Sequence, residues 1–71
     1  MKFVGLTNNP DELKRIHGNP EDWWERVFSN EYEARKWMRV LVKNYGYKIA
    51  GMGYGWKYGF TYTPQQQYKV A

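Results

Sequence analysis

The sequence has no cysteine and only one histidine, His17. The absence of cysteine excludes a disulfide framework and a zinc–thiolate site, and one histidine cannot supply a histidine cluster for a metal. No apolar run approaches the roughly 18 residues that a membrane-spanning helix needs, and Met1–Leu6 is too short for the core of a signal peptide. We therefore expect a soluble, cytoplasmic protein with no cofactor, no metal and no membrane contact.

Acidic residues are confined to the first half of the chain. Residues 34–71 contain seven Lys and Arg but no Asp or Glu, whereas residues 1–33 contain four basic and seven acidic side chains. A basic, aromatic-rich segment favours a polyanionic partner such as nucleic acid. A solvated surface, together with the preference of cations for a helix C-terminus, explains the same charges. Both interpretations stand at this point.

The length of 71 residues predicts one small domain with a modest core. Four Trp, seven Tyr and three Phe compensate, because each buries a large apolar area. Pro64 closes the patterned part of the sequence. We expect a single domain over residues 1–63 and a flexible C-terminal tail over residues 64–71.

The first part of the chain predicts a strand, a short helix and a second strand. Lys2–Leu6 is an apolar run typical of a buried strand. Asn9, with Glu12 three residues later, predicts a helix start, and Gly18 predicts its end. The aromatic and β-branched segment 22–28 predicts the second strand. Its neighbours Trp23 and Trp24 would point to opposite faces, so that one is buried and the other more exposed.

The main helix is predicted to begin after Asn30 and to end at Gly46. Apolar residues recur there at helical spacing and form the predicted buried stripe: Ala34, Trp37, Met38, Leu41, Val42 and Tyr45. Basic side chains continue along the outer side at Arg35, Arg39 and Lys43.

The C-terminal third alternates glycine with aromatic residues. Segment 48–50 suits a short strand, and the aromatics at every second position would share one strand face: Tyr54, Trp56, Tyr58, Phe60 and Tyr62. We expect most of this row to pack under a helix, with Trp56 as the member most exposed. The predicted architecture is α+β, a small central β-sheet of about three strands with two helices, in the order β-α-β-α-β(β).

The opening segment 3–17 carries a recognisable motif. Gly5, Thr7 and His17 have the spacing of a strand that ends in Tyr-Ile-Gly-x-Thr and leads into a helix bearing an Arg and, four residues later, a His. Over roughly residues 2–43 the chain resembles the GIY-YIG nuclease family, in truncated or rearranged form. The family's first strand has no counterpart before Lys2. We hypothesise that a strand around Phe60 takes its place beside the Phe3 segment.

The same resemblance implies that the chemistry of the family is lost. Phe3 stands at the position of the catalytic Tyr, Leu13 at that of the Arg, and Met38 at that of the metal-binding Glu. Phosphodiester hydrolysis needs a cation and a metal at the transition state, and none of these side chains supplies either. We therefore expect a vestigial site without nuclease activity, made of Phe3, Gly5, Thr7, Leu13, His17 and Met38.

Three functions remain open. The first is a non-catalytic module that binds nucleic acid through Arg35, Lys36, Arg39, Lys43, Lys48, Trp56 and Lys57. The second is a protein-interaction or assembly module, monomeric or weakly dimeric, that uses the vacated site and the Trp pair. The third is a residual hydrolase with His17 as base or phosphate ligand, although a hydrogen-bonded structural histidine explains His17 more simply.

Overall fold

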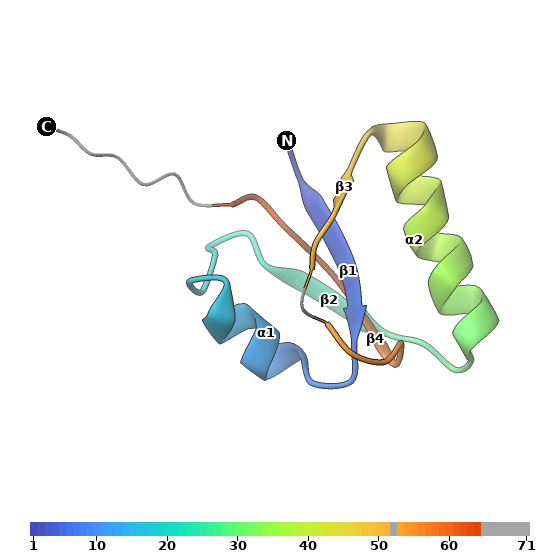
Figure 1. The fold of residues 1–71 in the computed structure, drawn as a ribbon, viewed down its shortest axis with the longest axis horizontal. Helices are drawn as coiled ribbons and strands as arrows, with labels where there is room; N and C mark the ends of the chain where they lie inside the picture. Colours follow the sequence, from blue (N-terminus) through green and yellow to red (C-terminus); the bar gives the residue numbers. More distant parts are fainter. Residues whose placement is uncertain (52, 65–71) are drawn as a thin grey trace, which may run out of the picture.

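The computed structural model describes residues 1–51 and 53–64, which form two helices and a four-stranded mixed sheet (Figure 1). The elements in chain order are β1 (Phe3–Thr7), α1 (Pro10–Ile16), β2 (Trp24–Val27), α2 (Glu31–Tyr45), β3 (Lys48–Ile49) and β4 (Tyr58–Tyr62). The fold is α+β in the predicted order, with one strand more than the roughly three expected. Beyond Pro64, the predicted tail lies outside the described residues.

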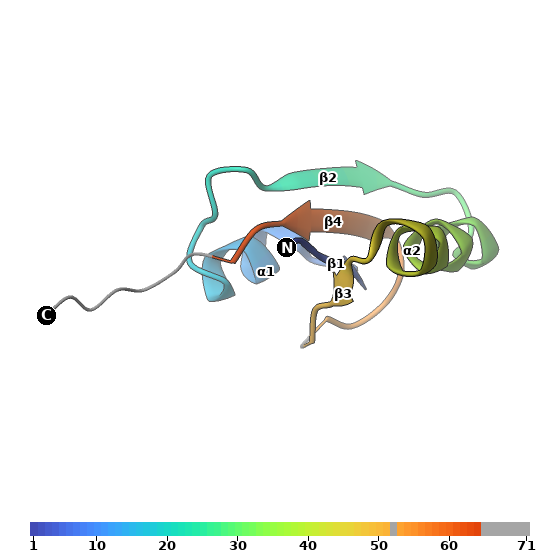
Figure 2. The same cartoon turned by 90° about the horizontal axis from the view of Figure 1, so that it is seen from above.

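The strands lie in the order β2-β4-β1-β3 (Figure 2). β4 is antiparallel to both of its neighbours, so that Phe60 lies between Gly5 of β1 and Glu25 of β2. β3 pairs with β1 in parallel and forms one edge, and β2 forms the other. The predicted pairing of the Phe60 segment with the Phe3 segment is therefore confirmed.

Local signals in the sequence fix both helices. The Asn9 side chain accepts a hydrogen bond from the Glu12 amide at 3.2 Å at the start of α1, and the Asn30 side chain accepts one from the Glu33 amide at 2.9 Å at the start of α2. These bonds satisfy amide groups that the first helical turn leaves unpaired. Gly46 ends α2 with a φ of 73°, which only glycine adopts readily.

The helices cover opposite faces of the sheet, and the core is divided accordingly (Figure 1). On the α2 face, buried Leu6, Phe28 and Ala34 form a cluster that Trp37, Met38 and Trp56 cover. On the α1 face, buried Leu13, Phe60 and Tyr62 form a cluster that Phe3, Trp23 and Ala50 cover. The alternation of side chains along β1 and β4 supplies both faces at once.

The second strand is shorter than predicted. β2 covers only Trp24–Val27 of the expected segment 22–28, and all four residues are exposed because the strand pairs on one side only. Trp23 precedes the strand and stacks on Phe60 at 4.7 Å between ring centroids, whereas Trp24 is 49% exposed on the other face. Trp23 is only partly buried, so the expectation of one buried and one more exposed tryptophan is confirmed in part.

Three expectations about aromatic side chains are wrong. Tyr45 is 69% exposed and does not join the buried stripe of α2, because the helix extends past the edge of the cluster beneath it. Trp56 is not the exposed member of its row, since it is half-buried against the α2-face cluster, while Tyr54 is 85% exposed. Both residues precede β4, so the predicted common face holds only for Tyr58, Phe60 and Tyr62.

No helix within residues 1–51 and 53–64 combines the length and apolar character needed to cross a membrane.

Candidate nucleic-acid interface

Most of the vestigial positions gather on the α1 face. Leu13 is 4% exposed and joins the cluster of Phe60 and Tyr62, against which Phe3 also packs. Gly5 lies directly under the Phe60 ring, where an added Cβ would stand 2.6 Å from its Cζ atom. The place where the resembled family has its catalytic Tyr and Arg is thus filled by packed apolar side chains.

Thr7 has a structural contact at the end of β1. It is 1% exposed, and its Oγ1 accepts a hydrogen bond from the Asn9 amide at 3.0 Å. The bond ties the end of the strand to the residue that caps α1. The neighbouring Asn8 holds the segment before β4, since its Oδ1 accepts from the Trp56 amide at 3.3 Å and the Lys57 amide at 3.2 Å.

His17 is bound into the aromatic cluster at the C-terminal end of α1. Its Nδ1 lies 3.1 Å from the Tyr62 hydroxyl, at hydrogen-bond distance, and its Nε2 is buried without a hydrogen-bond partner among residues 1–51 and 53–64. Burial lowers the pKa of His17 below the ordinary 6.5, and burial raises the pKa of Tyr62. The imidazole is therefore neutral at pH 7, which weakens it as a ligand for a phosphate anion.

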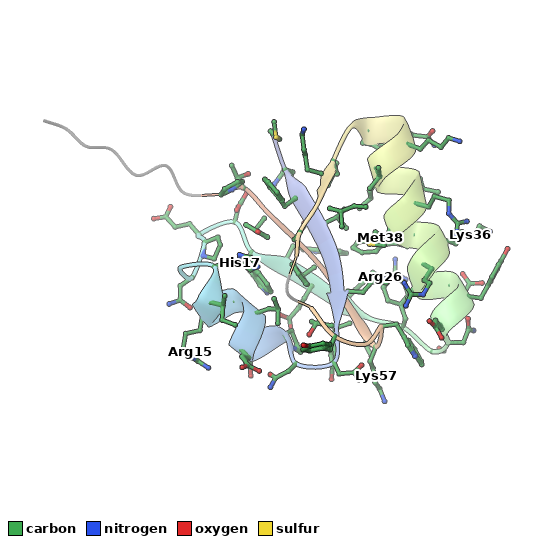
Figure 3. All side chains as sticks on the ribbon, in the orientation of Figure 1. Arg15, His17, Arg26, Lys36, Met38 and Lys57 are labelled. Atoms are coloured by element: carbon green, nitrogen blue, oxygen red, sulfur yellow. The ribbon has the colours of Figure 1, made fainter. Side chains whose placement is uncertain are left out.

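Met38 lies on the other side of the sheet. It packs against Leu6, Phe28 and Ala34 on the α2 face, whereas Leu13 and His17 belong to the α1 face. Figure 3 shows the labelled His17 and Met38 on the two sides of the strands. Five of the six vestigial positions thus lie along β1 and α1, and the structure does not bring Met38 to them.

Acidic side chains do not converge on His17. Within the part of the chain that the structure describes, no group of three or more His, Asp or Glu residues has the arrangement to hold a metal ion. The best-connected carboxylate is Asp22, which accepts from Lys2 Nζ at 2.8 Å, the Thr63 amide at 2.9 Å and Thr63 Oγ1 at 2.7 Å. These bonds, that to Lys2 foremost, hold the pKa of Asp22 well below its usual range. Asp22 therefore links the start of β1 to the end of β4, which lie side by side at one end of the sheet.

The predicted basic residues of α2 form one exposed surface. Arg35, Arg39 and Lys43 are spaced four residues apart, so they follow one another along the outer side of the helix, and Lys36 lies beside them. Arg35 Nε donates to Glu31 Oε2 at 2.7 Å in a half-exposed pair, and Lys36 Nζ lies 5.9 Å from the centre of the Tyr32 ring. We call Arg35, Lys36, Arg39 and Lys43 the α2 basic surface.

The other predicted contacts lie elsewhere. Lys48 pairs with Phe3 across β3 and β1, which directs its side chain to the face opposite α2. Lys57 precedes β4 at the end of the sheet where β1 finishes, and Figure 3 shows it well away from Lys36. Trp56 is half-buried. Of the seven predicted residues, the structure brings only the four of the α2 basic surface together.

A groove that the sequence did not predict runs between β2 and α2. It has a volume of about 240 Å³ and is lined by Arg26, Phe28, Glu33, Lys36, Trp37 and Val40. We call it the β2–α2 groove, because Arg26 lines it from β2 and Lys36 lines it from α2. The only signal in the sequence was the alternation Trp24-Glu25-Arg26, which places Trp24 and Arg26 on one face of a strand.

Comparisons with known proteins identify no relative. No protein-family model matches the chain, and neither a curated protein nor a solved structure is significantly similar to it.

Proposed function

We propose that this protein is a non-catalytic, GIY-YIG-like module that binds nucleic acid through the α2 basic surface. The observation that carries the proposal is the row of exposed cations on one helix. Its nearest acidic residues are Glu31 and Glu33 in the first turn, and none follows them along the chain. A row of this kind neutralises several phosphates along a strand and releases their counterions. A cytoplasmic location and a monomeric or weakly dimeric state are part of the proposal.

The packing of the vestigial positions supports the absence of catalysis. Leu13 and Met38 each fill a different apolar cluster, on opposite faces of the sheet. His17 is neutral at pH 7 and bonded to Tyr62. Among these vestigial positions, no cation stands in for the family's Arg and no carboxylate for its metal-binding Glu. These side chains therefore give no support to phosphodiester cleavage by the mechanism of the resembled family.

The test is the salt dependence of binding to a fluorescently labelled oligonucleotide, followed by anisotropy. The Arg39→Ala/Lys43→Ala variant removes two contacts. We expect the negative slope of log K against log [salt] to become less steep by about 1.4, at about 0.7 per single-strand phosphate. The matched control, Lys14→Ala/Arg15→Ala, removes the same charge from α1 on the opposite face and should leave the slope unchanged.

Three outcomes would contradict the proposal or part of it. Equal losses in both variants would mean that only net charge matters, and binding that is insensitive to salt would exclude phosphate contacts as its source. Cleavage of the oligonucleotide in the presence of Mg²⁺ or Mn²⁺ would overturn the non-catalytic part and return His17 to consideration as a base.

A protein-interaction module is the second candidate, and the exposed edge of β2 favours it. Trp24 and Val27 are 49% and 57% exposed there, and within the described part of the chain the outer edge of β2 pairs with no other strand. An edge of this kind accepts a further strand from a partner. A complex that survives high salt and depends on Val27 would support this candidate over the first.

A further inference from the structure

Three aromatic rings form a continuous wall between β2 and α2. The ring centroids of Trp24 and Trp37 are 6.2 Å apart, and those of Trp37 and Phe28 are 5.3 Å apart. Trp37 and Phe28 are supported from below by the α2-face cluster, whereas half of the Trp24 surface is open to solvent. The wall therefore combines a rigid base with one accessible ring at the edge of the sheet.

Two cationic side chains, Arg26 and Lys36, lie beside these aromatic rings. The Arg26 guanidinium lies 4.6 Å from the centre of the Phe28 ring, and Lys36 lines the groove from the α2 side. Stacking on the ring fixes the guanidinium while leaving its N–H groups able to bind an anion. Glu33 is the one carboxylate that lines the groove. A ligand that matches all of these groups has a flat ring, an anionic group and a hydrogen-bond donor.

We propose that the β2–α2 groove binds an unpaired nucleotide of single-stranded nucleic acid. Trp24 does not line the groove but lies beside it, with its ring centroid 6.2 Å from that of Trp37. The base stacks on Trp24 at this end of the groove, and the adjoining phosphates contact Arg26 and Lys36. In a duplex the bases are stacked on one another and cannot reach a side chain of this kind, so the groove selects single strands. The inference rests on the proposed function and deepens it, because the α2 basic surface by itself does not distinguish single strands from duplex.

Glu33 adds a preference among bases. Its carboxylate accepts a hydrogen bond from an exocyclic amino group, which cytosine and adenine carry and thymine lacks. The same carboxylate repels a phosphate, so the phosphates contact Arg26 and Lys36 and avoid Glu33. Strands rich in cytosine therefore bind more tightly than strands rich in thymine.

A second copy of the chain fits this edge poorly. The Phe28 amide bonds to the Lys57 carbonyl at 2.8 Å, so the alternate residues Glu25 and Val27 turn their backbone groups outward. When two β2 strands from two copies of the chain pair symmetrically and antiparallel, opposed residues share a face of the sheet. A residue near the middle of β2 then lies opposite the same residue of the other copy. In the two registers that pair most of β2, Glu25 lies opposite Glu25 or Arg26 opposite Arg26, and like charges oppose both.

The experiment compares a single-stranded oligonucleotide with a duplex of the same length by anisotropy at one salt concentration. We expect Trp24→Ala to weaken single-strand binding about tenfold, as for the loss of one stacked base, and to leave duplex binding unchanged. Tyr45→Ala removes a more exposed aromatic residue at the far end of α2 and is the matched control. Arg26→Ala is compared in the same way with Arg15→Ala, which lies on the other side of the molecule (Figure 3).

The outcomes separate this inference from the proposed function. Salt-sensitive binding with no effect of Trp24→Ala beyond that of Tyr45→Ala would overturn the groove and leave the α2 basic surface standing. Absence of binding to either nucleic acid would overturn both. Equal affinity for oligo(dC) and oligo(dT) would remove the assignment to Glu33.

Discussion

Gly59 offers the sharpest test of how α2 sits on the sheet. This residue lies in β4 under the indole of Trp37, and an added Cβ would overlap that ring and stand 2.8 Å from Phe28 Cε2. Both rings belong to the packed α2-face side of the core, so neither can move aside freely. We expect Gly59→Ala to push Trp37 outward, to loosen α2 and to disturb the β2–α2 groove.

The magnitude follows from two opposing contributions to the free energy of unfolding. Forcing a methyl group into a packed core costs about 1–3 kcal/mol. Replacing glycine in a strand returns about 0.5–1 kcal/mol, because alanine has less backbone freedom to lose on folding. The net loss is about 1–2 kcal/mol, and at about 4–8 °C per kcal/mol for a chain of this size, Tm falls by roughly 5–15 °C.

Thermal unfolding followed by circular dichroism measures the effect, and Gly51→Ala is the matched control. A Cβ at Gly51 would meet nothing within 4 Å, so that variant should unfold at or slightly above the temperature of the unmodified protein. The cost of Gly59→Ala should be smaller in a Trp37→Leu background than in the unmodified protein, because the two sites are in contact and leucine is smaller than tryptophan. If Gly59→Ala is as stable as Gly51→Ala, the placement of Trp37 over β4 is wrong.

Three further predictions concern the α1 face and the end of the sheet where Asp22 lies. Leu13→Ala should lower the free energy of unfolding by about 3 kcal/mol, measured by urea denaturation, because it empties a buried position; a loss below about 1 kcal/mol would contradict its burial. The ring protons of His17 should titrate by NMR with a midpoint below 6.5, so its neutral form adds stability above that pH that is lost on acidification; a midpoint at or above 6.5 would refute the burial of the ring. Asp22 has a lowered pKa, so its contribution is present above about pH 4 and is lost at lower pH. Asp22→Asn should therefore cost about 1 kcal/mol at pH 7 and little near pH 2, and an equal cost at both values would show that its charge is irrelevant.

The parts of the fold that the sequence predicted correctly are those that local chemistry decides. Asn9 and Asn30 cap the helices where expected, and Gly46 ends α2 in the left-handed conformation. The alternation in segment 58–62 gave the buried face of β4. The missing edge beside the Phe3 segment led to the correct pairing of β1 with β4. Each of these depends on residues close in the chain or on a single pairing.

The errors arise where the outcome depends on which elements meet in space. Leu13 and Met38 both pack into apolar clusters as predicted. The spacing of apolar residues along a helix cannot predict which face of the sheet the helix covers, and α1 and α2 cover opposite faces. Trp56 continues the every-second-residue spacing of the aromatic residues in β4. However, its backbone amide donates to Asn8 Oδ1 before β4 begins, and its side chain packs on the α2 face instead. The groove at Arg26 was missed because it is shared by β2 and α2, and no segment contains it alone.

The central claim, that this is a non-catalytic module binding nucleic acid, is tested most directly by an amide-shift titration. The labelled protein is titrated with a single-stranded oligonucleotide at low and at moderate salt, and the oligonucleotide is then examined for cleavage. We expect salt-sensitive shifts at Arg35, Arg39 and Lys43 and at the β2 residues Trp24 and Arg26, with the oligonucleotide intact. No shifts at high oligonucleotide concentration, or shifts confined to α1 around His17, would contradict it.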